Sequence, residues 1–340
     1  MAVTQTDVAT LAGVARRTVS NVVNDFPHVS ADVRNRVKAA IEELGYEPNS
    51  TARSLRMGRT HTIGVALPEL DVGYFGEIGR LLMEVAEEFG YTVLISQTLG
   101  TRKREIQTLE KFRSQQVDGV IFSAISIDAT ELIGKLRGVP VVALGEHQLT
   151  SSLDRVAVDN VACTRMAVQH LLDIGRRRIA FIGRNRHASR SEMPDLRLRG
   201  YQEALHGFGL KHEPSLEVRV KGFHRKGGFD ATNRLLEADA EFDGVFCAND
   251  MLAFGTIRAL MDADRRVPED VAVVGFDDVE EAQFSVPRLT TVSPDKRRIT
   301  RAAVELLTAR IENGAEPVAF PADSFSLIVR ESTIRESVRL

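Results

Sequence analysis

The feature that most restricts the fold of this chain is an alternation, from residue 61 onward, between short apolar runs and amphipathic segments. The runs 61–68, 91–97 and 117–124 are rich in Val, Ile and Leu, and a segment with helical spacing of its apolar residues follows each of them. Strands that are buried on both faces of a parallel sheet have this composition, because helices cover both faces. The alternation therefore predicts an α/β core of parallel, doubly wound sheets.

A second series of apolar runs begins near Arg155, so we expect the core to have two lobes. The length of 340 residues agrees with this, since one ordinary domain holds about 100–200 residues. A strand near 289–292, a helix over 295–312 and a final strand are expected to complete the sheets. The predicted boundaries are residues 60–160 and 291–320 for the first lobe and residues 161–290 and 321–335 for the second.

Residues 1–47 have a different pattern and are predicted to form an all-α headpiece of three short helices. The expected helices are 7–12 capped by Thr6, Arg16 to Asn24 after a turn at Gly13, and 31–44 between Ser30 and Gly45. Residues 48–59 contain Pro48 and a short basic stretch. We interpret this stretch as a hinge helix or a linker between the headpiece and the core at 60–340.

The first two predicted helices and the tight turn between them are typical of DNA-binding proteins. Arg16, Arg17 and Asn21 lie near one exposed face of the second helix, toward the end that enters a major groove in helix-turn-helix proteins. Arg donates two hydrogen bonds to guanine and Asn to adenine, and hydroxyl groups suit phosphates. From these residues alone, a solvated helix pair with incidental charges remains open.

The charge of the whole chain does not indicate a nucleic-acid partner, because 44 Lys and Arg stand against 47 Asp and Glu. The charges are nevertheless unevenly divided. Residues 1–59 carry eight basic and six acidic side chains, whereas residues 60–340 carry 36 and 41. This division predicts that contact with DNA is confined to the small N-terminal part.

Motifs that run in order through nearly the whole chain resemble the lactose-repressor/purine-repressor (LacI/GalR) family. In the N-terminal part they are Asp7-Val8-Ala9, Ala12-Gly13-Val14, Thr18-Val19-Ser20, Leu44-Gly45-Tyr46 and Ala52-Arg53-Ser54-Leu55. In the core they include VDGVIF (117–122), HLLDIGRRRIAFIG (170–183), FCANDMLAFG (246–255) and VPEDVAVVGFDD (267–278). The resemblance implies a dimeric transcription regulator, more often a repressor, with a core like that of periplasmic sugar-binding proteins.

The resemblance also implies roles for residues of the headpiece and the hinge, with a pseudo-palindromic double-stranded DNA operator as the partner. The base-reading positions are Arg16, Arg17 and Asn21. The phosphate-contacting positions are Thr4, Thr18, Ser20, Asn24, His28 and Ser30. Leu55 aligns with a leucine that wedges into the minor groove, with Ala52 and Arg53 beside it. Ala15 departs from the family, because many members have a capping Ser there and Ala has no capping side chain.

In the core, the resemblance implies a small-molecule effector, a sugar or a sugar derivative, bound between the lobes. The implied contacts are Tyr74, Phe75, Arg197, Phe223, Asn249 and Asp277. Without the resemblance, helix capping is the simpler interpretation of Asn249 and Asp277. Gly145 replaces a frequent acidic residue, and basic residues are gained at Arg184, Arg186, His187, Arg190, His224, Arg225 and Lys226. An anionic effector and a solvated basic surface both remain open.

Two alternative functions remain to be weighed, a nucleotide-dependent enzyme and a cytoplasmic small-molecule binding protein. Gly73, Gly76 and Gly79 are spaced GxxGxxG rather than GxGxxG, and neither a GxxxxGK[ST] loop nor a GxSxG elbow occurs. We therefore expect no catalytic residues and no cofactor. Cys163, Cys247 and the eight scattered histidines form no metal-ligand motif.

Localisation and oligomeric state are also expectations at this point. The N-terminus has no pattern of a signal peptide, and no run of about 18 apolar residues occurs, so we expect a cytoplasmic protein. Only TIRESVRL follows Ser332, which is too short for the C-terminal heptad helix of a family tetramer. The expected assembly is a homodimer.

Overall fold

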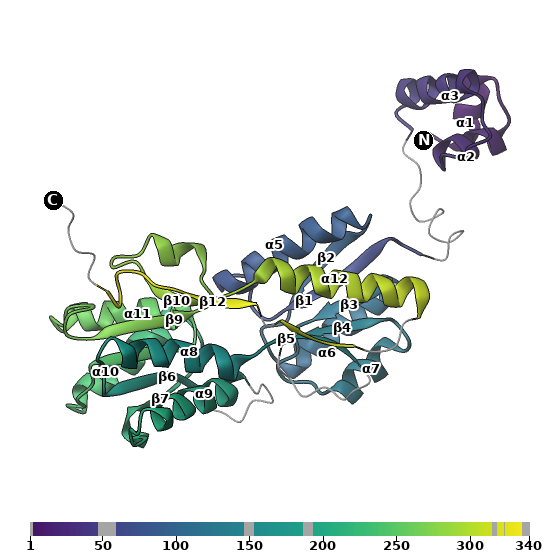
Figure 1. The fold of residues 1–340 in the computed structure, drawn as a ribbon. Coiled ribbons are helices and arrows are strands. Elements are labelled where there is room, and N and C mark those ends of the chain that lie inside the picture. The colour runs from purple at the N-terminus through teal and green to yellow at the C-terminus, as the bar shows by residue number, and fades with distance from the viewer. Residues whose placement is uncertain are drawn as a thin grey trace, which may run out of the picture. The chain divides into compact units, whose positions relative to one another are not determined.

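The computed structural model of the chain describes residues 3–46, 59–145, 153–185, 193–314, 318–322 and 324–334 (Figure 1). The chain divides into two compact units, residues 1–60 and 61–340. Each unit has hydrophobic clusters of its own.

The headpiece consists of α1 (Gln5–Ala12), α2 (Arg16–Val23) and α3 (Ala31–Leu44). Val8, Val19 and Val37 are completely buried where the three helices meet. Tyr46, the second residue after α3, is also buried and packs into the same cluster, so it belongs to the core of this small unit. The predicted order of three helices is thus present.

The ends of these helices agree with the predictions except at the first cap. Thr4, not Thr6, caps α1, because its hydroxyl accepts from the Asp7 amide while the Asp7 carboxylate accepts from the Thr4 amide at 2.8 Å. This reciprocal box satisfies two donors of the first turn at once, which a cap at Thr6 does not. Gly13 ends α1 with φ of 63°, a left-handed conformation that glycine adopts without steric cost.

The first lobe contains a six-stranded sheet in which all the paired strands are parallel (Figure 1). Its strand order is β11-β5-β4-β3-β1-β2. The bounds are β1 (Thr62–Leu67), β2 (Thr92–Gln97), β3 (Gly119–Phe122), β4 (Val141–Leu144), β5 (Asp154–Val158) and β11 (Ala319–Ala322). The helices α5 (Gly73–Glu88) and α12 (Lys296–Asn313) pack on one face, and α6 (Arg102–Ser114) and α7 (Ala129–Leu136) pack on the other.

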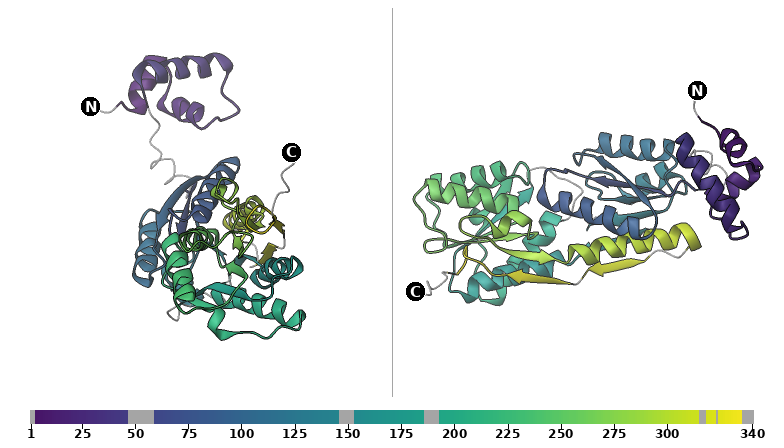
Figure 2. Two further views of the ribbon diagram at one scale, coloured as in Figure 1. Left: turned by 90° about the vertical axis from the view of Figure 1, so that its left-hand side faces the viewer. Right: turned by 90° about the horizontal axis from the view of Figure 1, so that it is seen from above.

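The second lobe contains another six-stranded sheet, in the order β12-β10-β9-β8-β6-β7. The strand bounds are β6 (Ile179–Asn185), β7 (Glu217–Val220), β8 (Gly244–Cys247), β9 (Ala272–Phe276), β10 (Thr290–Pro294) and β12 (Phe325–Ile328). The helices α8 (Asn160–Asp173) and α9 (Met193–Gly207) cover one face, and α10 (Arg225–Glu237) and α11 (Asp250–Asp262) cover the other (Figure 2). Short 3-10 turns occur at Pro214–Leu216 (η1) and Glu280–Gln283 (η2).

Two details of the predicted lobes differ in the structure. The strand β10 pairs with β9, so it belongs to the second lobe, although residues 291–294 were expected in the first. The strand β11 pairs with β5, which places residues 321 and 322 in the first lobe. The strand β12 runs antiparallel to β10 because the chain has already crossed back, so the second sheet is not entirely parallel.

Candidate functional sites

The predicted base-reading residues of the headpiece lie on the solvent side of α2. A helix advances about 100° per residue, so Arg16, Arg17 and Asn21 fall within one sector, opposite the buried Val19 and Val22. Both arginine side chains are exposed. In the described part of the headpiece, no ion pair draws either guanidinium back to the protein surface. The face can therefore present two cations and an amide to a ligand.

The side chains at two of the predicted phosphate-contacting positions make hydrogen bonds at the ends of helices. Asn24 follows the last turn of α2, and its side-chain amide donates to the Ser20 carbonyl at 2.6 Å and to the Ser20 hydroxyl at 3.4 Å. The Thr4 hydroxyl donates to the Asp7 carboxylate at 2.7 Å, and this hydrogen bond lowers the pKa of Asp7. Asn24 and Thr4 thus have structural tasks that any contact with a phosphate must share.

The other headpiece positions are less constrained. His28 is exposed and its ring contacts Phe26 edge-on, with the ring centroids 5.7 Å apart. Ser30 occupies the N-cap of α3 as predicted, but its hydroxyl makes no capping hydrogen bond. Thr18 is half-buried in the first turn of α2. Ala15 is the N-cap residue of α2 and provides no side-chain bond, as its side chain requires. The hinge residues Ala52, Arg53 and Leu55 lie outside the described residues.

In the core, the six predicted effector contacts come from segments that follow the carboxyl ends of parallel strands. Tyr74 and Phe75 begin α5 after β1, and Arg197 lies in α9 after β6. Phe223, Asn249 and Asp277 follow β7, β8 and β9. Ligands of open α/β sheets bind at this edge, because the loops there converge without a strand to block them. The topology therefore gives both lobes residues at the edge where a ligand is expected.

Arg197 is buried and held rigidly in the second lobe. Its Nε donates to Asn160 Oδ1 at 2.6 Å, and one terminal nitrogen donates to the Ala248 carbonyl. The guanidinium lies 3.5 Å from the centroid of the Phe276 ring. A guanidinium fixed by two hydrogen bonds and an aromatic face is pre-organised to receive a further acceptor. Asn160, which is itself buried, has no role in the sequence-based prediction.

Asn249 and Asp277 differ in how they use their side chains. Asn249 caps α11, since its Oδ1 accepts from the Leu252 amide at 2.9 Å, and its Nδ2 donates to the Phe223 carbonyl at 3.0 Å. The capping interpretation therefore holds for Asn249, which also ties the Phe223 loop to this edge. Asp277 is buried with φ of 114° and precedes the η2 turn without capping it, because Val279 is the N-cap residue there.

Asp250, next to Asn249, is a buried acid that sequence reasoning missed. Its carboxyl accepts from the Thr291 hydroxyl at 2.6 Å and from the Val279 amide at 3.0 Å. Burial, followed by the nearby Asp277 charge, raises the pKa of Asp250 well above its usual range. The Asn-Asp doublet in FCANDM was visible in the sequence, but nothing local distinguishes a capping residue from a buried partner of a distant loop.

The gained basic residues mostly have acidic partners. Arg184 pairs with Glu217 at 2.7 Å, Arg225 with Glu281 at 3.5 Å, and Lys226 with Asp230 at 2.8 Å. His224 of the second lobe meets Glu69 of the first lobe at 2.8 Å. Residues Arg186, His187 and Arg190 lie outside the described residues.

The backbone conformation at position 145 explains why this residue is glycine. Its φ is 103°, a value that residues with side chains rarely adopt. The glycine is thus needed for the path of the chain after β4. Together with the acidic partners of Arg184, His224, Arg225 and Lys226, this accounts for the described departures without an anionic effector.

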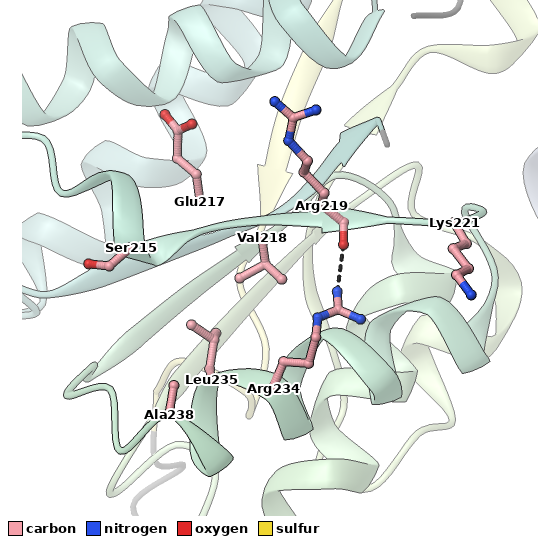
Figure 3. A pocket seen from close by; sticks show the side chains of 8 residues that line it. All are labelled: Ser215, Glu217, Val218, Arg219, Lys221, Arg234, Leu235 and Ala238. Atoms are coloured by element: carbon pink, nitrogen blue, oxygen red, sulfur yellow. Dashed lines mark hydrogen bonds between the residues drawn. The ribbon is translucent and has the colours of Figure 1, made fainter. Parts of the chain in front are cut away.

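A separate hollow of about 360 Å³ lies between β7, an edge strand, and α10 (Figure 3). Val218 and Leu235 form its apolar side, while the Arg234 guanidinium donates to the Arg219 carbonyl at 2.6 Å. Ala238, the C-cap residue of α10, also lines it, so the carbonyl end of a helix dipole is close by. None of the six predicted effector contacts lines this hollow.

Within the ranges that the structure describes, no group of three or more His, Cys, Asp or Glu side chains is arranged to hold a metal ion. None of the described helices has both the length and the apolar character needed to cross a membrane.

Comparison with known proteins gives matches over both units. Residues 4–49 match the family described as bacterial regulatory proteins, lacI family, and residues 168–333 match a periplasmic binding protein-like domain. The ribose operon repressor of Escherichia coli is 34% identical over 310 residues, which cover 91% of this chain and 93% of the repressor.

Solved structures of transcription regulators are similar to this chain over nearly its whole length. A lac repressor dimer bound to operator and the anti-inducer ONPF has a TM-score of 0.87 at 28% identity, covering 98% of this chain and 100% of that one. A complex of the transcriptional regulator CelR with cellobiose has a TM-score of 0.74 at 32% identity, covering 97% and 99%.

Proposed function

The chain belongs to the lacI family of bacterial regulatory proteins, and we propose that it acts as a homodimeric repressor whose affinity for a pseudo-palindromic operator is set by a sugar-like effector. The family consists of DNA-binding transcription regulators, so the alternative of a nucleotide-dependent enzyme is set aside. A regulator of this kind works where the chromosome is, and the proposal accordingly places the protein in the cytoplasm.

The observation that carries the DNA-binding proposal is the exposed face of α2, with Arg16, Arg17 and Asn21 set on a helix whose other side is buried. In this assignment the two arginines and Asn21 read bases, while Thr18, Ser20, His28 and Ser30, together with Thr4 and Asn24, face phosphates. Leu55, with Ala52 and Arg53 beside it, is assigned to the central minor groove, where inserting an apolar side chain kinks the duplex.

The recognition assignment is tested with an operator selected from random duplex DNA by the full-length protein. Arg16→Ala and Arg17→Ala are each expected to weaken operator binding by about 1–3 kcal/mol and to relax selectivity at one base pair. Lys38→Ala is the control, because Lys38 is exposed on α3 and was given no contact with DNA. If both arginine variants keep the wild-type base preferences, the recognition face has been assigned wrongly.

The effector proposal is supported by the buried Arg197 and Asp277 of the second lobe and by Tyr74 and Phe75 of the first. The names of two relatives, which refer to ribose and cellobiose, favour a sugar. Calorimetry on the full chain with D-ribose, cellobiose and their phosphate esters tests this choice. Binding of the esters without binding of the neutral sugars would refute a neutral sugar as the effector.

The dimer proposal is supported by two apolar side chains on the second lobe. Phe284 is 72% exposed and Val286 is 81% exposed, an unusual degree for large apolar residues that lie two positions apart. A related lac repressor is a dimer in its operator complex. We assign these two side chains to the contact between protomers.

A further inference from the structure

The short segment from Asp277 to Glu280, which we name the 277–280 segment, joins β9 to η2 and has an unusual backbone. Asp277 has φ of 114° and Asp278 has φ of 49°. Two successive positive values are unfavourable for residues with side chains, and such conformations persist only where the surroundings hold them. The contacts that hold this segment therefore indicate what it is connected to.

Part of the support comes from the second lobe itself. The Asp277 amide donates to the Val292 carbonyl at 2.9 Å, and the Val279 amide donates to the buried Asp250 carboxyl at 3.0 Å. The Arg330 guanidinium donates to the Asp278 carboxylate at 2.8 Å. These bonds fix the segment to β10, to the start of α11 and to the chain after β12.

Further support comes from the first lobe, through Glu77 of α5 and Lys296 at the start of α12. One oxygen of Glu77 accepts from the Glu280 amide at 3.0 Å, and the other pairs with Lys296. Lys296 in turn donates to the Asp278 carbonyl at 2.8 Å. The two side chains thus bind the peptide groups on both sides of Val279. The helices α5 and α12 that carry them pack against each other (Figure 1).

The hydrogen bonds from Glu77 and Lys296 to the 277–280 segment, which we call the grip, are well shielded from solvent. The Lys296 side chain is 12% exposed and that of Glu77 is 24% exposed, whereas the other pairs between α5 and α12 are more open. Charge pairs with little water around them are screened less than surface pairs. Val279 lies in a small apolar cluster with Val72 of the first lobe and Met251 of the second, so apolar packing also joins the lobes at this point.

We propose that Glu77 and Lys296 are positioning residues that fasten the 277–280 segment to the first lobe, so that occupancy at Asp277 is transmitted to the arrangement of the lobes. The inference rests on the proposed function, in which Asp277 contacts the effector. Because Asp277 is only one to three residues from the gripped peptide groups, a ligand that shifts it must strain or release the bonds to Glu77 and Lys296.

The test uses the full-length chain without effector or DNA, so its result does not depend on whether either has been identified correctly. Amide hydrogen exchange is measured for peptides that cover residues 277–284 in the wild type and in Glu77→Ala and Lys296→Met. Glu77→Ala removes the acceptor of the Glu280 amide, Lys296→Met removes the donor to the Asp278 carbonyl, and both leave Asp250 and Arg330 in place. Exchange at these peptides is expected to become about tenfold faster, the change that follows from the loss of one hydrogen bond to a charged group.

The matched control is Glu84→Ala. Glu84 also lies on α5 and pairs with Arg297 of α12 at 3.3 Å, but it does not contact the 277–280 segment. A second measurement uses spin labels at the exposed positions Gln115 of the first lobe and Glu237 of the second, with the distance distribution recorded for each variant. Glu77→Ala is expected to broaden this distribution and Glu84→Ala to leave it unchanged.

Three results would overturn the proposal. Exchange at 277–284 in Glu77→Ala equal to wild type would show that the grip does not hold the segment. Equal acceleration in Glu84→Ala would show a general loosening of α5. Faster exchange with an unchanged distance between the lobes would show that the grip is not what ties the lobes together. Failure of operator or sugar binding is measured separately and would instead refute the proposed function.

Discussion

Replacement of Arg197 by methionine should lower the free energy of unfolding of the core by about 2–4 kcal/mol. Arg197 is 7% exposed, and methionine fills much of the same volume without donors. The substitution therefore removes the hydrogen bonds and the ring contact while leaving most of the packing.

The magnitude follows from the contacts of this side chain. Asn160 Oδ1 and the Ala248 carbonyl lose their guanidinium donor, and a hydrogen bond to a charged group contributes about 1.5–3 kcal/mol. The contact with the Phe276 ring contributes roughly 0.5–2 kcal/mol more. Apolar contacts of the methionine and local rearrangement of Asn160 offset part of this, which gives the range of about 2–4 kcal/mol.

The measurement is thermal and urea unfolding followed by circular dichroism, since the chain has no tryptophan to report by fluorescence. For a core of this size the expected loss corresponds to a fall in Tm of roughly 4–15 °C. Binding of the selected operator should change little at a temperature where the variant is folded, because the headpiece is a separate unit.

Arg199→Met is the matched control on the same helix. Its side chain is 62% exposed and its distance to Glu203 is 3.6 Å, so the loss of this surface pair is expected to have little effect. If Arg197→Met is as stable as Arg199→Met, Arg197 does not organise the second lobe in the way described, and its assignment as a pre-organised effector contact fails with it.

Three further predictions concern the hinge, the assembly and the buried acid. Leu55→Ala should weaken binding to the selected operator more than binding to unrelated DNA, and equal losses in a salt-matched gel shift would identify residues 48–59 as a plain linker. Phe284→Ser should raise the concentration at which sedimentation detects dimers, and an unchanged association constant would place the contact elsewhere. Asp250 has a folded-state pKa above its unfolded value, so its contribution to stability is complete below about pH 4 and is lost as the pH rises toward the raised pKa. The free energy of unfolding of the wild type should therefore fall relative to that of Asp250→Asn over that interval. A difference that is independent of pH would contradict the inference that the Asp250 carboxyl is buried in its neutral form.

Much of the local structure was predictable because its causes are local. Gly13 and Gly45 were predicted as helix ends, and both adopt the left-handed conformation that this position requires. Thr4 instead of Thr6 as the first cap was also open to local reasoning, because Asp7 stands three residues after Thr4 and completes the capping box.

Other residues could not be found in this way. Glu77 and Lys296 are 219 positions apart, and each alone is an ordinary charge at the start of a helix. In the sequence, Asn160 is an ordinary polar residue after a strand. Its role depends on the hydrogen bond from Arg197, which lies 37 positions later in the chain. The membership of β10 in the second sheet was not predicted, because the sequence of an apolar strand does not indicate which sheet it joins.

Periodicity and capping act over a few residues, so they were enough to predict the succession of strands and helices, the three-helix headpiece and the face of α2 that carries Arg16 and Arg17. Three outcomes become apparent only in the folded molecule: which sheet receives the last strands, which acids neutralise the basic residues, and that Glu77 and Lys296 meet the 277–280 segment. Those outcomes depend on contacts between residues far apart in the chain, and their partners are chosen by the packing of whole elements.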